Sequence, residues 1–168
     1  MIRIAGINEN DFVNGKGVSV SLFLQGCPFH CKGCHNPETW DSNGGEVWDW
    51  NVLINHILEL ITANGIQRNL SILGGEPLDT YEKRDFLKLL IRVVRNRFPD
   101  IVICVWTGYT FEQLTKDTHL IGTGDILANI DYLIEGPFKL EERDITLKWR
   151  GSRNQNILNL KEGVIEND

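Results

Sequence analysis

Three cysteines fall within eight residues near the start of the chain, at Cys27, Cys31 and Cys34, in the spacing C-x3-C-x2-C. The chain of 168 residues has one other cysteine, Cys104. Four cysteines so unevenly spread do not suit a domain that is held together by disulfides. Thiolates this close in sequence can instead converge on one soft metal centre. The cysteine loop therefore predicts a metal or cluster site in a protein whose thiols stay reduced.

The spacing leaves the nature of the metal centre open. Structural zinc sites usually have four ligands, and His30 or His35 would complete a set of three cysteines and one histidine. Three cysteines also suit a cluster of four irons and four sulfides, in which the protein holds three irons and the fourth stays open to a substrate or cofactor. A third alternative is that the thiols bind nothing and belong to the core.

Composition narrows the classes of partner. The chain carries 17 Lys and Arg against 23 Asp and Glu, a net charge of -6, so we expect neither nucleic acid nor an anionic membrane surface as a partner. No run of about 18 apolar residues is present to span a membrane. The first residues, MIRIAGINENDF, lack the basic and apolar regions of a secretory signal. We expect a cytoplasmic protein with a single domain over residues 1–168.

Strand-like and helix-like segments alternate along the chain. Short apolar runs predict strands, and apolar residues at helical spacing, such as Leu53, Ile57 and Ile61, predict helices. The expected strands cover residues 18–24, 70–73, 101–106 and 130–134, with short ones at 145–149 and 156–160, and the expected helices cover 47–63, 81–98 and 111–116. Helix 81–98 has its basic residues opposite its apolar stripe, at Lys83, Arg84, Lys88, Arg92 and Arg95. This order predicts an α/β fold built from βαβ units, with a mainly parallel sheet.

Functional groups in such folds lie on the loops that leave the C-terminal ends of the strands. The cysteine loop follows the first expected strand, and the next two strands are followed by Gly74-Gly75-Glu76-Pro77 and by Thr107-Gly108-Tyr109. We expect these three loops to meet at one edge of the sheet. Two glycines let a backbone approach a ligand closely and Glu76 supplies an acceptor, although such a sequence is more often only a turn.

Taken together, the cysteine loop and the Gly74–Pro77 loop resemble those of the radical S-adenosylmethionine (SAM) enzymes. The resemblance implies an open, partial TIM-like β/α barrel in which Cys27, Cys31 and Cys34 hold a 4Fe-4S cluster. The amino and carboxylate groups of SAM would chelate the open iron, and the Gly74–Pro77 loop would bind the amino group. One electron from the cluster would cleave SAM to methionine and a 5′-deoxyadenosyl radical, which takes a hydrogen atom from the substrate.

Four flanking segments narrow the resemblance to the activases of glycyl-radical enzymes, and most closely to the activating proteins of anaerobic (class III) ribonucleotide reductase. They are Asp11–Gly17 (DFVNGKG), Cys34–Trp40 (CHNPETW), Trp106–Tyr109 (WTGY) and Trp149–Gln155 (WRGSRNQ), so the resemblance covers most of the chain. The chain is shorter than activases of the pyruvate formate-lyase type and lacks the extra cysteine clusters of others. Gly33 fits the reductase-activating type, whereas Lys16 and Ser19 replace the Pro and Arg usual before the cysteine loop.

For such a protein the resemblance implies a backbone glycine of a large, separate reductase chain as substrate, and a small flavoprotein as electron donor. It also places Gly33, Cys34 and His35 beside SAM, with the His35 backbone near the adenine, and Thr107 near the ribose or carboxylate. Three other functions stay open: activation of another glycyl-radical enzyme, of the pyruvate formate-lyase type; radical chemistry on a small molecule, as in deazapurine synthases; and a zinc-binding interaction module.

Two further features have a structural and a functional interpretation. Cys104 lies in the apolar run IVICVW, where a free cysteine behaves as a small hydrophobic residue, so we expect it in the core. Lys148, Arg150 and Arg153 form a basic patch in an acidic chain. The patch is either a solvated surface or a site for docking or for contact near SAM.

Overall fold

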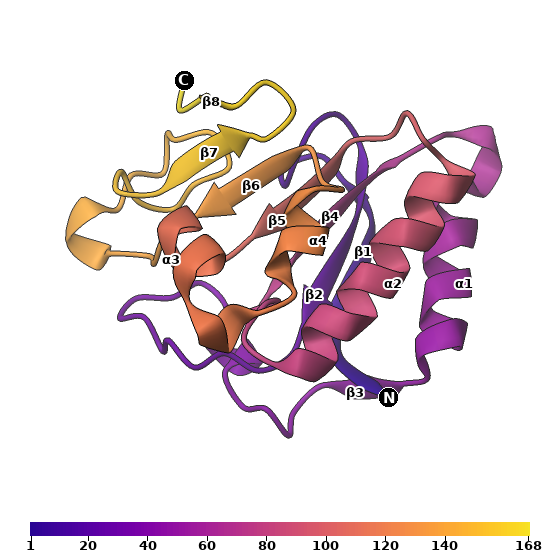
Figure 1. Ribbon diagram of the computed structural model, residues 1–168, viewed down its shortest axis with the longest axis horizontal. Coiled ribbons are helices and arrows are strands. Elements are labelled where there is room, and N and C mark those ends of the chain that lie inside the picture. Colours follow the sequence, from indigo (N-terminus) through magenta and orange to yellow (C-terminus); the bar gives the residue numbers. More distant parts are fainter.

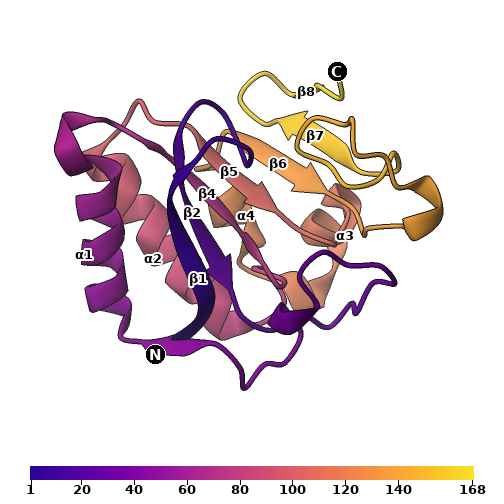
Figure 2. The same cartoon turned by 180° about the vertical axis from the view of Figure 1, so that it is seen from behind.

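One open sheet of eight strands runs through the computed structural model, which describes residues 1–168, and α1 and α2 cover one of its faces (Figures 1 and 2). The strands are β1 (Ile2–Asp11), β2 (Ser19–Leu24), β3 (Glu46–Trp48), β4 (Asn69–Gly74), β5 (Ile103–Trp106), β6 (Tyr132–Glu135), β7 (Asn156–Asn159) and β8 (Val164–Ile165). The helices are α1 (Trp50–Ile61), α2 (Tyr81–Arg97), α3 (Phe111–Lys116) and α4 (Thr123–Leu127), with 3-10 turns at Pro37–Thr39, Ala63–Gly65, Thr118–Leu120 and Leu140–Glu142.

The sheet is mixed, with the strand order β3-β1-β2-β4-β5-β6-β7-β8. Its centre, β2-β4-β5-β6, is parallel, whereas β1 and β3 on one side and β7 and β8 on the other add antiparallel pairings. The α/β class is therefore confirmed, and the prediction of a mainly parallel sheet is wrong. The antiparallel pairing of β1 with β2 follows from the short connection between them. A connection of that length can join antiparallel neighbours but is too short for a crossover between parallel ones.

The central strands and the three expected helices lie close to their predicted positions. The long first strand, β1, is missing from the prediction because only its first residues alternate clearly, with Ile2 and Ile4 buried. The strand expected at 145–149 is wrong, since this segment forms turns. There the Asp144 carboxylate accepts hydrogen bonds from the amide and hydroxyl of Thr146, and Ile145 is 84% exposed. Side chains of Asp bind their own backbone in this way and favour turns over strands.

Alternate residues of the central strands form the main core with α1 and α2. Each helix begins at a side-chain cap, the Asp49 carboxylate for α1 and the Thr80 hydroxyl for α2. The strands contribute Val20, Leu22, Leu70, Ile72, Ile103 and Val105, and the helices contribute Leu53, Ile57, Phe86, Leu87 and Leu90. Burying each such side chain fully stabilises the fold by about 1.5–3 kcal/mol, so this face supplies most of the driving force. None of the helices combines the length and hydrophobicity that crossing a bilayer needs.

The opposite face of the same strands carries small polar side chains, with Ser19, Ser21 and Ser71 all fully buried. The loop between β1 and β2 folds over this face, where the Ser71 hydroxyl donates to the carbonyl oxygen of Asn14 at 2.7 Å. Gly15 has a φ of +103°, and a Cβ there would lie 2.5 Å from the Ser71 hydroxyl. The loop therefore fits only because the residues beneath it are small.

Candidate functional site

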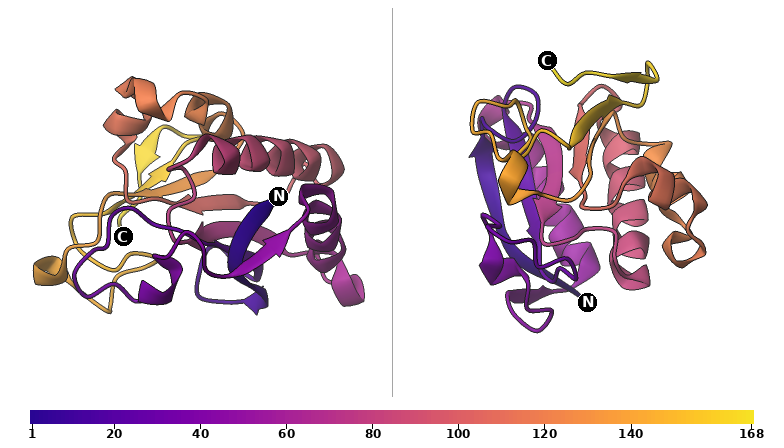
Figure 3. Two further views of the ribbon diagram at one scale, coloured as in Figure 1. Left: turned by 90° about the horizontal axis from the view of Figure 1, so that it is seen from below. Right: turned by 90° about the vertical axis from the view of Figure 1, so that its left-hand side faces the viewer.

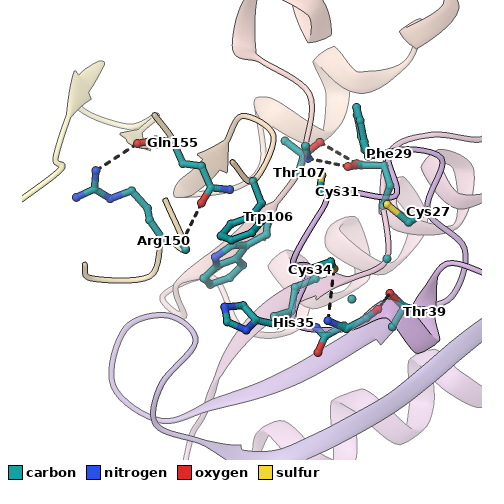
Figure 4. A pocket seen from close by; sticks show the side chains of 18 of the residues that line it. Cys27, Phe29, Cys31, Cys34, His35, Thr39, Trp106, Thr107, Arg150 and Gln155 are labelled. Carbon is teal, nitrogen blue, oxygen red and sulfur yellow. Dashed lines mark hydrogen bonds between the residues drawn. The ribbon is translucent and has the colours of Figure 1, made fainter. Parts of the chain in front are cut away.

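The loops that follow β2, β4 and β5 meet at the C-terminal edge of the parallel strands, as the sequence predicted (Figure 4). They surround a cavity of about 500 Å³. It is lined by the three cysteines of the cysteine loop and by residues of the other two loops, Gly74, Gly75, Glu76 and Thr107. Figure 3 shows that the cysteine loop also lies beside the segment that joins β6 to β7.

The cysteine loop is held at its base by the backbone that follows it. The Gly26 amide donates to the carbonyl of Thr39 at 2.7 Å, and the Cys27 amide donates to that of Trp40 at 3.2 Å. Within the loop, the Cys34 amide donates to the carbonyl of Cys31 at 3.0 Å and forms a tight turn. Gly33 takes a φ of +77° in that turn. Side chains other than glycine rarely adopt this conformation, which explains why glycine stands there.

The three thiols are free and partly exposed to the cavity. Burial raises the pKa of the Cys27 and Cys31 thiols above the usual 9.0, so metal loading would release protons from them. The Asn36 amide donates to the Cys34 sulfur at 3.4 Å. No three His, Cys, Asp or Glu side chains lie close enough together to hold a single metal ion.

The two histidines near the cysteines lie differently. His30 stacks on Trp40 with ring centroids 4.8 Å apart, and it has a positive φ of 47°. His35 lines the cavity, 5.9 Å from the ring of Phe138. From the sequence, both histidines are candidates for a fourth zinc ligand. In the structure only His35 lines the cavity that the three cysteines share.

Gly74 and Gly75 are required by the approach of the protein's own backbone. A Cβ on Gly75 would lie 2.3 Å from the carbonyl oxygen of Gly26, and one on Gly74 would lie 2.4 Å from the amide nitrogen of Leu24. The Gly75 amide donates to the Leu24 carbonyl, and the Glu76 amide donates to the Gly26 carbonyl, both at 2.8 Å. The two glycines thus let the ends of β2 and β4 stay in contact, whereas the sequence had suggested only closeness to a ligand.

The Glu76 carboxylate connects the loop after β4 to the loop after β5. It is 1% exposed and accepts hydrogen bonds from the Thr107 hydroxyl at 2.7 Å, the Gly108 amide at 2.7 Å and the Leu78 amide at 3.0 Å. Burial raises the pKa of Glu76 to about 7 and outweighs these three hydrogen bonds, which lower it. Both of its oxygens therefore have partners within the protein, and buried Pro77 continues the loop towards α2.

Gly108 explains how the cysteine loop and the loop after β5 fit together. A Cβ on Gly108 would lie 2.7 Å from the ring of Phe29, which is part of the cysteine loop. The ring of Phe29 in turn packs edge-on against Tyr109, with centroids 4.8 Å apart. A side chain at position 108 would therefore push the cysteine loop away from the sheet.

The segment between β6 and β7 forms a large part of the cavity wall, which the sequence indicated only through its Trp149–Gln155 motif. It contributes Phe138, Asp144, Ile145, Leu147, Trp149, Arg150, Gly151 and Gln155. Its Leu140 packs against Gly33, where a Cβ would lie 2.8 Å from the leucine side chain. Trp106 completes this wall, and its indole nitrogen donates to the Trp149 carbonyl at 2.8 Å.

The basic patch predicted at Lys148–Arg153 does not act as a unit. Arg150 is 9% exposed and donates to the backbone carbonyls of Gln155 and Asn167, while Figure 4 shows its guanidinium directed away from the cysteines. Arg153 pairs with Asp144 at 3.2 Å. Lys148 lies over the ring of Trp149. Of the three, Arg150 has a structural role, because it joins the cavity wall to the end of the chain.

Cys104 lies on β5 and does not line the cavity. Its side chain is 1% exposed and packs with Tyr132, Ile134 and Ile157. Burial raises the pKa of this thiol to about 12, so it stays protonated at neutral pH. The expectation of a core cysteine is confirmed.

Comparison with known proteins relates this site to a defined family. The profile of a family described as a 4Fe-4S single cluster domain matches residues 13–158, which include every loop around the cavity. The anaerobic ribonucleoside-triphosphate reductase-activating protein of Haemophilus influenzae is 38% identical over 152 residues, covering 90% of this chain and 94% of the relative. The chain belongs to the family of anaerobic ribonucleoside-triphosphate reductase-activating proteins. The resemblance to reductase-activating proteins, which was inferred from the segments flanking the cysteine loop, is thereby confirmed.

Other activating proteins of this family match over similar lengths. The protein of Vibrio cholerae is 37% identical over 147 residues, covering 88% of this chain and 91% of the relative. That of Enterobacteria phage T4 is 34% identical over 160 residues, covering 94% of each. As a member of the family, the chain is a 4Fe-4S cluster domain. Its three partly exposed thiols around one cavity fit such a cluster, because soft thiolates are the ligands that iron–sulfur clusters use.

Proposed function

We propose that the chain generates a glycyl radical on an anaerobic ribonucleotide reductase, using a 4Fe-4S cluster and SAM. The observation that carries the proposal is that Cys27, Cys31 and Cys34 share one cavity with the Gly74–Pro77 loop, in a chain of the reductase-activating family. The cluster, when bound, supplies one electron for the reductive cleavage of SAM at its open iron.

The three cysteines are the proposed ligands of the cluster, and the protein leaves the fourth iron free. The turn at Gly33 and the hydrogen bond from the Asn36 amide keep the Cys34 sulfur directed at the cavity. The base of the loop, pinned at Gly26 and Cys27, limits how far the three sulfurs can separate. These contacts fix the backbone of the loop, and the three thiols would draw together as the cluster is loaded.

SAM is proposed to lie between the cysteine loop and the loops after β4 and β5. The backbone of Gly74, Gly75 and Glu76, with Pro77 behind it, forms the side of the cavity nearest β4. Cys34 and His35 line the cavity on the side of the cysteine loop, with Gly33 in the turn just before them, and Thr107 lines it from the loop after β5. The Glu76 carboxylate acts through Thr107 and Gly108, since it holds both in place and is itself fully buried.

The partner is proposed to be the large reductase chain, which presents a backbone glycine on a flexible segment. The cavity is open towards solvent beside Val13 and Ile145, which are 76% and 84% exposed. In this view, the four parallel strands correspond to part of the TIM-like barrel of radical SAM enzymes, and the unclosed sheet leaves room for the segment. A small flavoprotein is the proposed electron donor, and free thiols are consistent with a reducing, cytoplasmic setting.

Anaerobic reconstitution with iron and sulfide tests the proposal. We expect about four irons per chain, SAM-dependent formation of methionine, and a glycyl radical by electron paramagnetic resonance when the reductase is added. Stoichiometric zinc without iron would instead identify a zinc-binding module. Turnover of a small substrate with no glycyl radical would identify a small-molecule radical enzyme, and a radical on a pyruvate formate-lyase type enzyme alone would identify a different partner.

A further inference from the structure

A buried lysine lies beneath the cysteine loop and the Gly74–Pro77 loop. Lys83 belongs to the first turn of α2, where the sequence pattern places it on the basic face of the helix. In the structure it is only 7% exposed. A lysine is rarely buried to this extent unless its ammonium group has several partners.

The Lys83 ammonium group has three oxygen partners, of which two accept hydrogen bonds and one forms an ion pair. The Nζ atom donates to the carbonyl oxygens of Gly26 and Glu76, both at 2.9 Å, and forms an ion pair with Asp79 at 2.8 Å. Gly26 immediately precedes the ligand Cys27, and Glu76 belongs to the loop proposed to bind SAM. One cation therefore connects the backbone on the two sides of the site.

Unlike an ordinary buried ion pair, Lys83 also joins the backbone of two separate loops. Two carbonyl dipoles from separate loops point at the same ammonium group, and they repel each other when that charge is absent. Two backbone hydrogen bonds also join these segments, from the Glu76 amide to the Gly26 carbonyl and from the Gly75 amide to the Leu24 carbonyl, both at 2.8 Å. Removing Lys83 therefore frees the Glu76 carbonyl and loosens the spacing between the loops, even where the fold survives.

We propose that Lys83 is a positioning residue that holds the cysteine loop and the Gly74–Pro77 loop at the spacing needed to bind SAM. The inference rests on the proposed function, because it assigns Lys83 to the proposed SAM site. The cluster itself depends less on this spacing, since all three of its ligands lie on the cysteine loop.

The Lys83→Met variant removes the cation and keeps a side chain of similar length. It also leaves the Asp79 carboxylate, whose side chain is 13% exposed, without its ion-pair partner. This lowers the stability of the fold for a reason unrelated to the loops. The double variant Asp79→Asn/Lys83→Met removes that complication, because neither charge remains. We expect the double variant to recover stability relative to the single variant, to load iron as the wild type does, and to bind SAM about 10- to 100-fold more weakly.

Arg95→Met is the matched control on the same helix. Arg95 pairs with buried Asp131 and donates to backbone carbonyls at the other end of the sheet, outside the cavity lining. Its loss should destabilise the chain in urea while leaving the SAM dissociation constant at the wild-type value. A weaker SAM affinity in this control would show that any destabilisation produces the effect, and it would overturn the role of Lys83.

Two measurements decide the question: equilibrium binding of SAM to the reconstituted proteins, and amide hydrogen exchange of the proteins without cluster. In the double variant we expect faster exchange of the Glu76 amide, which bridges the loops, with unchanged exchange of amides in β5. Wild-type SAM affinity and exchange in the double variant would mean that Lys83 only neutralises Asp79, and the inference would fall. A wild-type chain that binds no SAM would overturn the proposed function, and this inference with it.

Discussion

On one face of the central sheet the strands meet α1 and α2, and on the other they meet the loop that joins β1 to β2 (Figures 1 and 2). The cavity lies on that second side, at the C-terminal ends of the strands. Neighbouring residues of the same strand point to opposite faces. In each pair the first residue faces the cavity side and the second the helices: Ser21 and Leu22 on β2, Ser71 and Ile72 on β4, and Cys104 and Val105 on β5.

The difference between the faces separates stability from chemistry. The helix-covered face is filled with large aliphatic side chains that pack without polar atoms. On the other face, β2 and β4 carry small side chains that leave room for the loop before β2, and β5 to β7 carry a smaller apolar cluster around Cys104. Changes on the two faces should therefore affect different properties.

The largest expected effect is at the site. Cys31→Ala should abolish binding of the cluster, because only two proposed ligands remain, and SAM cleavage should be lost with it. The thiol is partly exposed, so the midpoint of urea unfolding of the protein without cluster should stay near the wild-type value. Iron analysis and urea titration measure the two properties separately. Full iron loading in this variant would mean that the ligands are misassigned.

A substitution on the helix-covered face should instead affect stability and leave cluster binding unchanged. Leu22→Ala should lower the free energy of unfolding by about 2–5 kcal/mol, since Leu22 is fully buried in the main core. Below the unfolding transition the variant should still load iron to the wild-type level. Loss of iron loading from fully folded Leu22→Ala protein would break the separation of the two faces.

A third prediction concerns the N-terminal ends of the parallel strands, at the edge of the sheet away from the cavity. There Asp131 is buried against Arg95 and Lys161. Burial opposes ionisation of Asp131, but hydrogen bonds from Lys161, the Ile103 amide and Arg95 outweigh it and hold the pKa below 3.8. Asp131→Asn should cost about 2–3 kcal/mol, less than a fully buried pair because Lys161 is exposed.

The effect of Asp131 depends on pH in a definite direction. A carboxylate whose pKa is lowered by folding stabilises the folded state above pH 3.8, and that contribution is lost as the pH falls through its folded value. The difference in unfolding free energy between wild type and Asp131→Asn should therefore be constant above about pH 5 and shrink below pH 4. Urea titrations across this range measure it, and a difference that grows on acidification contradicts the assignment.

The smallest effect is expected for the fourth cysteine. Cys104→Ala removes one buried sulfur atom and should cost about 1 kcal/mol of stability, comparable with a buried methylene group. Iron content, SAM affinity and radical yield should not change, because the thiol lies outside the cavity. A fall in iron loading would show that Cys104 takes part in cluster assembly.

Local pattern predicted most of the fold near the site. The apolar runs before the cysteine, Gly74–Pro77 and Thr107 loops are strands, and strands of one parallel set place their following loops at one edge. The pattern was less informative for β1, whose later residues are exposed, and for the turns at 145–149. The direction of the outer strands was also not predicted. Whether β1, β3, β7 and β8 pair antiparallel depends on the connections between strands, which hydrophobic periodicity does not reveal.

Sequence alone determined the family and the spacing of the three cysteines that are proposed as cluster ligands, because residue type and spacing are local properties. Tertiary structure decided how the donors are supported. The Glu76 carboxylate meets a hydroxyl 31 residues away, and Lys83 meets a carbonyl 57 residues away. Such partners are chosen by the packing of β2, β4 and β5 against α2. The helix pattern places Lys83 on the polar face and therefore could not predict that it is buried against two backbone carbonyls in the folded chain.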